Sequence, residues 1–240
     1  HSLDRRQRQM CIRDRISGEH FNMRTYKASV FGSTGLIGGF LMDILINDPF
    51  CEQVVTLTRN KVIINNTKHK NHVIDFSSLN EIKKTIKNSD YVYSGIGTTQ
   101  SRVNYNKKIY RSIDYDITLN IARACKENGI KSFCLVSTAG ADRSKNNFYL
   151  SLKGEIDEDV SKIGIDSLSI FRPSLLLGKR NEKRFGEKLA QYVMPLFSSL
   201  MPEDYRPIRA DYVASAMHKI SMKNIKGNNI YHFKKIMDNL

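Results

Sequence analysis

Residues 27–39 read K-A-S-V-F-G-S-T-G-L-I-G-G, and they predict a strand, a glycine turn and a helix in immediate succession. Residues 28–31 are apolar and β-prone, and Gly32, Gly35 and Gly38 follow at three-residue spacing. Apolar residues at helical spacing come next: Leu36, Ile37, Phe40, Leu41, Ile44 and Leu45. In such a unit the first glycine permits a sharp turn, the second lets the backbone approach a pyrophosphate, and the third lets the helix pack close to the strand. The pattern predicts dinucleotide binding at the helix N-terminus; a plain glycine-rich turn is the alternative.

Length and composition indicate one globular α/β domain. The chain has 240 residues, of which 40% are hydrophobic and 26% are charged, and this is enough for a full core. No apolar run reaches the roughly 18 residues that would span a bilayer. The four cysteines have no metal-ligand spacing, and no cysteine or acid joins His69 and His72, so we expect no metal site. Reduced thiols are typical of the cytosol, so we expect a cytoplasmic location.

The formal net charge of +14 indicates either a solvated lysine-rich surface or an anionic partner. The lysines are scattered along the chain and form neither an arginine-rich helix nor a nucleic-acid motif. We therefore expect no specific nucleic-acid binding. An anionic cofactor or substrate stays open.

Residues 1–22 differ in composition from the rest of the chain. They hold five arginines and no lysine, and they lack the apolar segment of a secretory signal. An arginine-rich targeting peptide is the alternative, although Asp4, Asp14 and Glu19 argue against it. We expect an extraneous or disordered segment here, followed by a single domain over residues 23–240.

Predicted strands and helices alternate along that domain. Strands are expected over residues 28–31, 53–58, 72–76, 131–136 and 165–171, with another that begins at Tyr91 and runs into a glycine turn. Helices are expected over residues 79–86, 113–124, 149–163, 185–200 and 211–220. This alternation predicts an α/β fold with a doubly wound parallel sheet. Residues 181–240 would mainly form a small C-terminal substrate lobe.

The residues after the second predicted strand favour NADP(H) as the cofactor. In a dinucleotide fold that strand end faces the adenosine ribose, and NAD-binding units place an acid there. This chain has Arg59 and Lys61 instead, and a cation suits a 2′-phosphate. We expect Arg59 on that phosphate, and NADP(H) rather than NAD(H). Asp75, near the end of the third predicted strand, would accept from the adenine amino group or cap the next helix with Ser77 or Ser78.

Tyr149 and Lys153 lie four residues apart on one predicted helix, so their side chains share a face. A nearby ammonium stabilises a phenolate, so the tyrosine can donate a proton to a carbonyl oxygen or take one from an alcohol. Ser137, at the carboxyl end of the preceding strand, could hydrogen-bond the same oxygen, and hydride would come from a nicotinamide. The alternative is a surface tyrosine beside a solvated lysine. A second Y-x-x-x-K, at Tyr231 and Lys235, has no serine-bearing strand before it.

These motifs together resemble the short-chain dehydrogenase/reductase superfamily, in its atypical branch. The resemblance is carried by the three glycines of the turn, by Ser137 and by Tyr149-x-x-x-Lys153. More narrowly, four segments are similar to the Tat-interacting-protein oxidoreductases and their bacterial relatives: residues 97–99, 140–142, 149–155 and 171–173. The similar region runs from about residue 27 to about residue 215.

The resemblance implies a Rossmann domain that binds NADP(H), with Ser137, Tyr149 and Lys153 as catalytic residues and Thr138 as the alternative hydroxyl. The motifs and the resemblance together give these expected cofactor-binding residues: Gly32, Ser33, Thr34, Gly35, Leu36, Ile37, Gly38, Arg59, Asp75, Phe76, Ile96, Gly97, Tyr149, Lys153, Pro173, Leu176 and Arg184. Two functions stay open. One is an oxidoreductase acting on a small carbonyl or alcohol substrate; the other is an NADP(H)-binding regulatory module with little turnover that acts through a protein partner.

Overall fold

The computed structural model describes residues 24–178 and 202–240. Their core is a seven-stranded sheet in the order β3-β2-β1-β4-β5-β6-β9, in which every neighbouring pair is parallel. The strands are β1 (Tyr26–Phe31), β2 (Cys51–Thr58), β3 (His69–Val73), β4 (Tyr91–Ser94), β5 (Ser132–Val136), β6 (Ser167–Phe171) and β9 (Gly227–Tyr231). The prediction of a doubly wound parallel sheet is confirmed.

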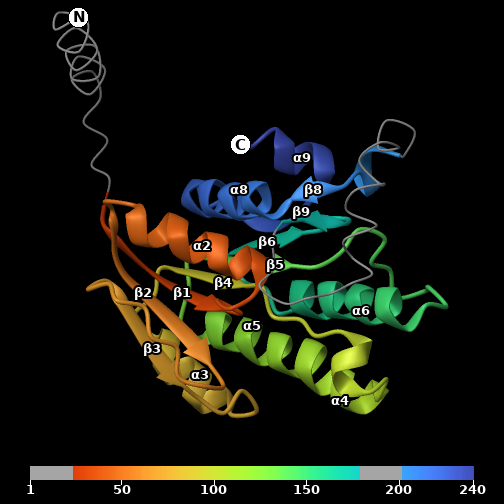
Figure 1. Ribbon diagram of the computed structural model, residues 1–240, viewed down its shortest axis with the longest axis horizontal. Helices are drawn as coiled ribbons and strands as arrows, with labels where there is room; N and C mark the ends of the chain where they lie inside the picture. Colours follow the sequence, from red (N-terminus) through yellow and green to blue (C-terminus); the bar gives the residue numbers. More distant parts are fainter. Residues whose placement is uncertain (1–23, 179–201) are drawn as a thin grey trace, which may run out of the picture.

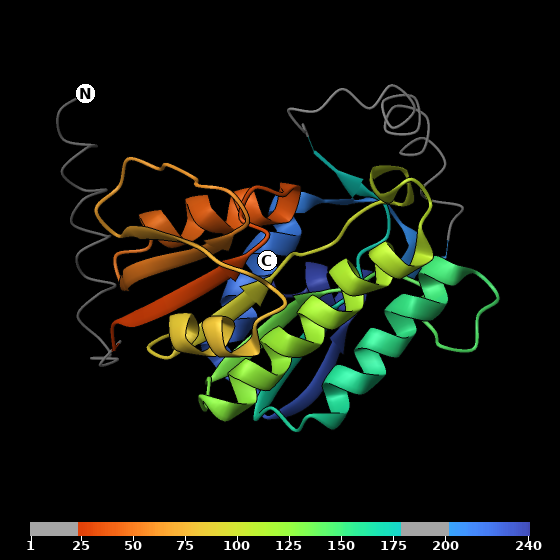
Figure 2. The same cartoon turned by 90° about the horizontal axis from the view of Figure 1, so that it is seen from below.

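Helices cover both faces of this sheet (Figures 1 and 2). One face carries α2 (Leu36–Asn47) and α8 (Ala210–Lys223), and the other carries α3 (Leu79–Ile86), α5 (Ile117–Glu127) and α6 (Phe148–Lys162). Two clusters of buried side chains result, one on each side of the strands. A two-stranded sheet of β7 (Leu176–Leu177) and β8 (Ile208–Arg209), and the short helix α9 (Phe233–Met237), complete the described C-terminal part.

The local sequence explains where two of these helices begin. The Ser78 hydroxyl accepts from the N–H of Glu81 at the start of α3, and the Asn147 side chain accepts from the N–H of Leu150 at the start of α6. Each is an N-cap that satisfies a backbone donor with no partner inside the helix. Asn147 thereby fixes the start of the helix that carries Tyr149.

The helix before β5 is not regular throughout. Helix α4 (Lys107–Arg111) continues through a π-helical turn, Ser112–Asp116, directly into α5. Such a turn holds one residue more than an α-helical turn, and it is often found at functional sites. Asp114 lies in its middle and is fully buried.

The structure differs from the sequence-based expectations in one strand and in two additional elements, and some expected segments lie outside the described residues. The third strand is His69–Val73 and not residues 72–76, because residues 54–58 of β2 pair with it in that register. The chain also has β9 and α9, which the sequence pattern did not predict. Residues 1–22, the expected helix over residues 185–200 and part of the expected substrate lobe lie outside the described residues.

Candidate functional site

Three of the turns that carry predicted site residues lie at the carboxyl ends of neighbouring strands. β1, β4 and β5 are adjacent in the sheet, and each runs into a turn that carries an expected residue: Gly32, Gly97 and Ser137. In an open parallel sheet, ligands bind beyond the carboxyl ends of the strands. The topology therefore places these three turns at one edge.

The turn after β1 has the tight geometry that its glycines predict. Gly32 has a φ of +77°, and a Cβ on it would lie 2.8 Å from the carbonyl group of Gly95. The N–H of Gly35 donates to the carbonyl oxygen of Gly32 over 2.9 Å. A Cβ on Gly38 would lie 2.1 Å from that same oxygen, so only glycine lets α2 start this close to the turn.

The N-terminus of α2 is suited to an anion. Its N-cap is Gly35, which has no side chain that could accept a hydrogen bond from the first N–H groups, and the first turn carries no acidic residue. Thr34 is exposed in the turn and Ile37 is buried in the helix. The buried hydroxyl of Ser33 has no hydrogen-bond partner among the described residues. Unpaired N–H groups and a spare hydroxyl fit the phosphates of a dinucleotide.

Gly38→Ala is expected to destabilise the fold by about 1–3 kcal/mol, because the added methyl group would enter space filled by the Gly32 carbonyl. Gly39→Ala is the matched control, since among residues 24–178 and 202–240 no atom outside the backbone of α2 itself lies within 4 Å of a Cβ there, and alanine is favoured over glycine in a helix by about 1 kcal/mol. Urea unfolding of both variants measures the difference. Equal stabilities would contradict the close approach of α2 to the turn.

Arg59 and Asp75 follow neighbouring strands, β2 and β3, and both are exposed. The carboxylate of Asp75 accepts from the N–H and the hydroxyl of Ser77 at 2.8 and 2.7 Å. These two bonds hold the pKa of Asp75 below its ordinary value. Asp75 thus shapes the loop before α3, while the helix cap itself is Ser78.

Phe76 and Ile96 contribute apolar surface on the same side of the sheet. Phe76 is buried and meets Phe31 edge-on, with 6.2 Å between the ring centroids. Ile96 is half-buried and packs against the same core. Phe76 therefore supports the strand ends from within the core.

An aspartate that was not predicted as a site residue organises the turn after β4. One carboxylate oxygen of Asp114 accepts from the N–H of Thr98 at 2.8 Å, and the other lies 2.8 Å from the ammonium of Lys153. Both members of this ion pair are buried. A Cβ on Gly97 would lie 3.6 Å from the carboxylate and 3.9 Å from the ammonium. The ion pair therefore reaches the backbone turn at which the cofactor is expected.

The charge of Lys153 is maintained by these neighbours. Burial opposes it, but the carboxylate of Asp114, with Tyr149 nearby, outweighs burial and raises the pKa of Lys153 above its ordinary value. The lysine therefore stays protonated at neutral pH. One signal in the sequence points to Asp114: it lies directly after Ile113 and three residues before Ile117, on a predicted apolar helix.

Tyr149 lies on α6 one helical turn before Lys153. Its half-buried ring meets Tyr110 edge-on, with 6.4 Å between the centroids. Tyr110 donates its hydroxyl to the carbonyl oxygen of Thr98 over 3.1 Å. The predicted tyrosine and lysine are thus both joined, through Tyr110 and Asp114, to the turn after β4.

Ser137 is buried, and its hydroxyl donates to the carboxylate of Asp157 on α6 over 2.9 Å. The same oxygen accepts from the guanidinium of Arg172 at 2.8 Å. Burial raises the pKa of Asp157, although Arg172 and Ser137 act against it. A hydroxyl has one hydrogen to donate, so in this arrangement Ser137 has none for a substrate oxygen. Thr138, the next residue, is half-buried and carries the alternative hydroxyl.

The segment after β6 returns toward the glycine turn. Pro173 accepts a backbone hydrogen bond from the loop after β5, and Leu176 is half-buried in β7. The side chain of Leu36, in the first turn of α2, lies 3.0 Å from the position of a Cβ on Gly178. Arg184, the last expected cofactor residue, lies outside the described residues.

Residues 24–178 and 202–240 contain neither a cluster of metal ligands nor a membrane-spanning helix. No three histidine, cysteine, aspartate or glutamate side chains come together as metal ligands would. No helix in these ranges has the length and apolar character needed to span a bilayer.

The family model for NAD(P)H-binding proteins matches residues 32–185. The chain is 31% identical over 204 residues to "Protein FMP52, mitochondrial" of Candida albicans, which covers 82% of this chain and 89% of that protein. It is 31% identical over 176 residues to "Protein HTATIP2" of Rattus norvegicus, which covers 72% of each.

Solved structures show the same fold. A UDP-N-acetylglucosamine 4-epimerase of Methanobrevibacter ruminantium, in complex with UDP-N-acetylmuramic acid, gives a TM-score of 0.68 over 87% of this chain and 77% of its own, at 16% identity. The enzyme WbmH of Bordetella bronchiseptica, in complex with NAD⁺, gives a TM-score of 0.66. The match covers 88% of this chain and 76% of that structure's chain, also at 16% sequence identity. At this identity the likeness concerns the fold alone.

The relatives contradict the cytoplasmic location expected from the sequence. Those from Candida albicans, Emericella nidulans and Aspergillus oryzae are all named as mitochondrial proteins. The expectation rested on cysteine usage, which indicates a reducing environment and does not distinguish one reducing compartment from another. The prediction of a cytoplasmic protein is therefore wrong.

Proposed function

Because this chain belongs to the family of NAD(P)H-binding proteins, we propose that it is an oxidoreductase that transfers hydride between a nicotinamide and a carbonyl or alcohol substrate. The observation that carries the proposal is the buried ammonium of Lys153, held at the turn after β4 and one helical turn from Tyr149. A phenol beside a fixed ammonium is the acid–base group that this reaction needs at the substrate oxygen.

In this proposal Tyr149, Lys153 and Asp114 have separate roles in the proton transfer. In reduction, the hydroxyl of Tyr149 donates its proton to the carbonyl oxygen, and in oxidation the phenolate takes a proton from the alcohol. Lys153 stabilises that phenolate, and Asp114 orients the ammonium while it holds the N–H of Thr98. A bound nicotinamide supplies or receives the hydride.

We assign the second hydrogen bond to the substrate oxygen to Thr138. Ser137, the residue that the motif first suggests, donates its hydrogen to Asp157 instead. Ser137 stays the alternative, because rotation of its hydroxyl away from Asp157 would free that hydrogen. A larger loss of turnover in Thr138→Val than in Ser137→Ala would support the assignment.

We propose NADP(H) as the cofactor, since Arg59 is exposed at the end of β2 and no acid lies beside it in the sequence. Arg59→Glu is expected to weaken NADPH binding by about 10- to 100-fold, because a charge-assisted hydrogen bond contributes about 1.5–3 kcal/mol. NADH binding should change little. Lys87→Glu, another exposed charge reversal, is the control, and an unchanged ratio of the two affinities in Arg59→Glu would refute the assignment.

A regulatory module with little turnover is the second candidate. Two observations favour it: Ser137 is committed to Asp157, and part of the charge of Lys153 is neutralised by Asp114 before it acts on Tyr149. Such a module would bind NADPH and act through a protein partner. Tight NADPH binding by calorimetry, with no NADPH consumption across a panel of carbonyl compounds, would favour this candidate over the enzyme.

The names of the fungal relatives lead us to propose a mitochondrial location for this protein as well. An arginine-rich targeting peptide was the alternative interpretation of residues 1–22, so the location of the chain should be compared in the presence and absence of this segment. Fractionation of cells that express the chain with and without them tests the location.

A further inference from the structure

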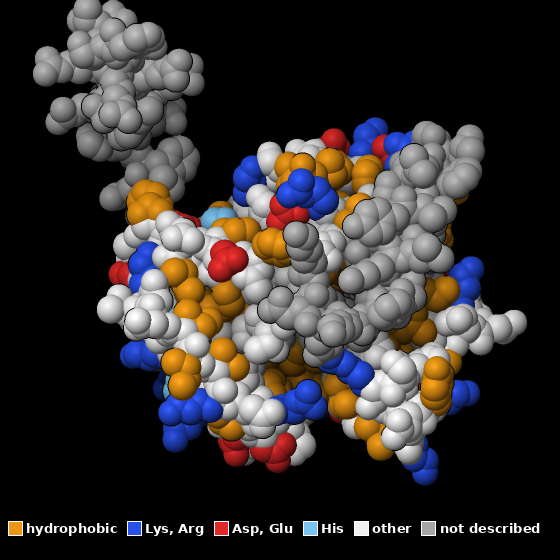
Figure 3. Space-filling view, viewed as in Figure 1, with side chains coloured by type: hydrophobic (Ala, Val, Ile, Leu, Met, Phe, Trp, Pro, Cys, Tyr) orange, Lys and Arg blue, Asp and Glu red, His pale blue; other side chains and the backbone are white. Residues whose placement is uncertain are grey.

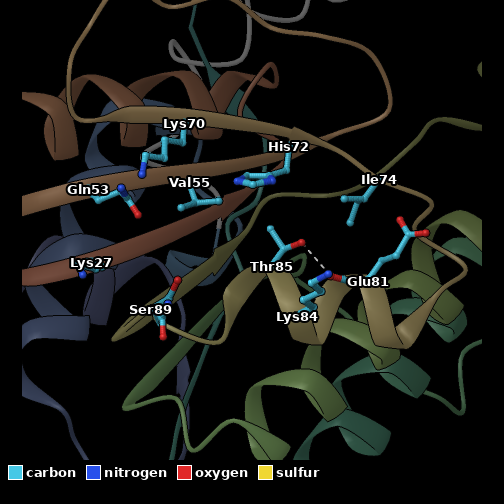
Figure 4. A pocket seen from close by; sticks show the side chains of 11 residues that line it. Lys27, Gln53, Val55, Lys70, His72, Ile74, Glu81, Lys84, Thr85 and Ser89 are labelled. Carbon is cyan, nitrogen blue, oxygen red and sulfur yellow. Dashed lines mark hydrogen bonds between the residues drawn. The ribbon is translucent and has the colours of Figure 1, made fainter.

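A groove of about 440 Å³ lies between the sheet and α3 (Figure 4). Its floor is formed by β1, β2 and β3, and its wall by one face of α3 and the residues that follow it. Small-molecule sites measure roughly 300–1,000 Å³, so the groove can hold a ligand of mononucleotide size. None of the expected dinucleotide-binding residues that the structure describes lines it.

The strand register decides which side chains enter this groove. In the parallel pairing, Lys27 lies beside Gln53, and Val55 lies beside Lys70. Because side chains alternate between the two faces of a strand, Lys70 and His72 leave β3 on the same face. Figure 4 shows both of them above the groove, opposite the residues of α3. The edge strand therefore presents a lysine and a histidine to the groove, where a central strand would present apolar side chains.

Three lysines from three different elements line the groove without an acidic partner. Lys27 comes from β1, Lys70 from β3 and Lys84 from α3, and none of them joins a side-chain ion pair within the described part of the chain. The acid that lines the groove, Glu81, already accepts the N–H of Asp75 at 2.9 Å. Three lysines that line one groove give it a positive potential, and such a potential attracts an anion.

The rest of the lining suits a ligand with both polar and apolar parts. Gln53, Asn88 and Ser89 offer hydrogen-bonding groups, and Val55 and Ile74 offer a small apolar surface. Lysine binds phosphate as a point charge. We propose that this groove binds a small organic phosphate of mononucleotide size, at a site separate from that of the nicotinamide cofactor.

The separation follows from the direction of the strands. Lys27 lies at the start of β1, and Ser89 lies just before β4 begins. The glycine turn and the turn after β4 lie at the opposite, carboxyl ends of the same two strands. A ligand on Lys27 and Ser89 is thus held at the end of the sheet away from the catalytic residues, while the other end of the groove, at Ile74 and Glu81, lies beside Asp75.

Calorimetric titration of the full chain with AMP, at saturating NADPH, tests the proposal. The cofactor occupies the adenosine subsite of the dinucleotide fold, so remaining AMP binding reports another site. We expect AMP to bind and adenosine not to bind. The double variant Lys70→Glu/Lys84→Glu should lose at least about tenfold in AMP affinity, and the matched control Lys219→Glu/Lys234→Glu, on exposed lysines of α8 and α9, should lose none.

A second measurement does not depend on the variants. AMP should shift the imidazole NMR signals of His72 in the wild-type chain, because that ring lines the groove. No AMP binding by the wild-type chain, equal AMP affinity in the groove variant, or binding without a shift at His72 would each overturn the proposal. Failure of NADPH to bind would refute the proposed function and leave the comparison of the two double variants valid.

Discussion

Tyr149→Phe is expected to lower kcat/KM for every carbonyl substrate by about a thousandfold and to leave NADPH affinity nearly unchanged. The variant removes the hydroxyl that donates the proton, and general acid catalysis contributes about 10²- to 10⁴-fold. The ring stays, so its edge-on packing against Tyr110 is kept. NADPH consumption across a panel of aldehydes and ketones measures the effect, with cofactor binding measured separately by calorimetry.

The chain provides a matched control for this experiment. Tyr231 and Lys235 repeat the Y-x-x-x-K spacing, but Tyr231 lies in β9 and stacks on Phe171, with 5.0 Å between the centroids. Tyr231→Phe should therefore retain turnover. If Tyr149→Phe reduces every active substrate as fast as the wild type does, the catalytic assignment fails and the regulatory module becomes the better interpretation.

Asp114→Asn is expected to destabilise the fold by about 3–5 kcal/mol, because it leaves the buried ammonium of Lys153 without its counter-charge. The asparagine keeps the shape and can still accept from the N–H of Thr98, so the change is mainly one of charge. The pKa of Lys153 should fall, since the carboxylate that raises it most is gone. Urea unfolding of the wild type and the variant gives the difference in the free energy of unfolding.

Two further variants separate the ion pair from its surroundings. Asp116→Asn, at an exposed position two residues along, should change stability by less than about 0.5 kcal/mol. The double variant Asp114→Asn/Lys153→Met should recover part of the loss, because no unpaired charge remains buried. Equal stabilities of Asp114→Asn and Asp116→Asn would show that the ion pair contributes nothing to the folded state.

Sequence patterns correctly predicted the elements whose conformation depends on residues close together in the chain. The strand, glycine turn and helix at residues 27–39 depend mainly on their own residues, since Gly32 adopts a φ of +77° and a Cβ on Gly38 would meet the carbonyl oxygen of Gly32. The edge strands β3 and β9 were misplaced or missed, because H-K-N-H-V and G-N-N-I-Y have little apolar alternation. Their strand conformation comes from pairing with β2 and β6, and a single-sequence pattern does not report that pairing.

The same limit applies to the candidate site. The spacing of Tyr149 and Lys153 along one helix was enough to predict a shared face. The partners of the site residues were not predictable, because the contacts of Asp114 with Lys153, and of Ser137 with Asp157, join elements that only the folded sheet brings together. The apolar residues around Asp114 indicate in the sequence that this acid is buried, but they do not indicate that its partner is Lys153.

The π-helical turn at Ser112–Asp116 also allows a comparison with related proteins. An α-helix rotates by about 100° per residue, so loss of a single residue from this helix would restore a regular spiral and swing one half of it around relative to the other. A relative that is one residue shorter here would turn a different side chain toward its lysine. The length of this helix in a related sequence therefore indicates whether the same helical position faces the lysine.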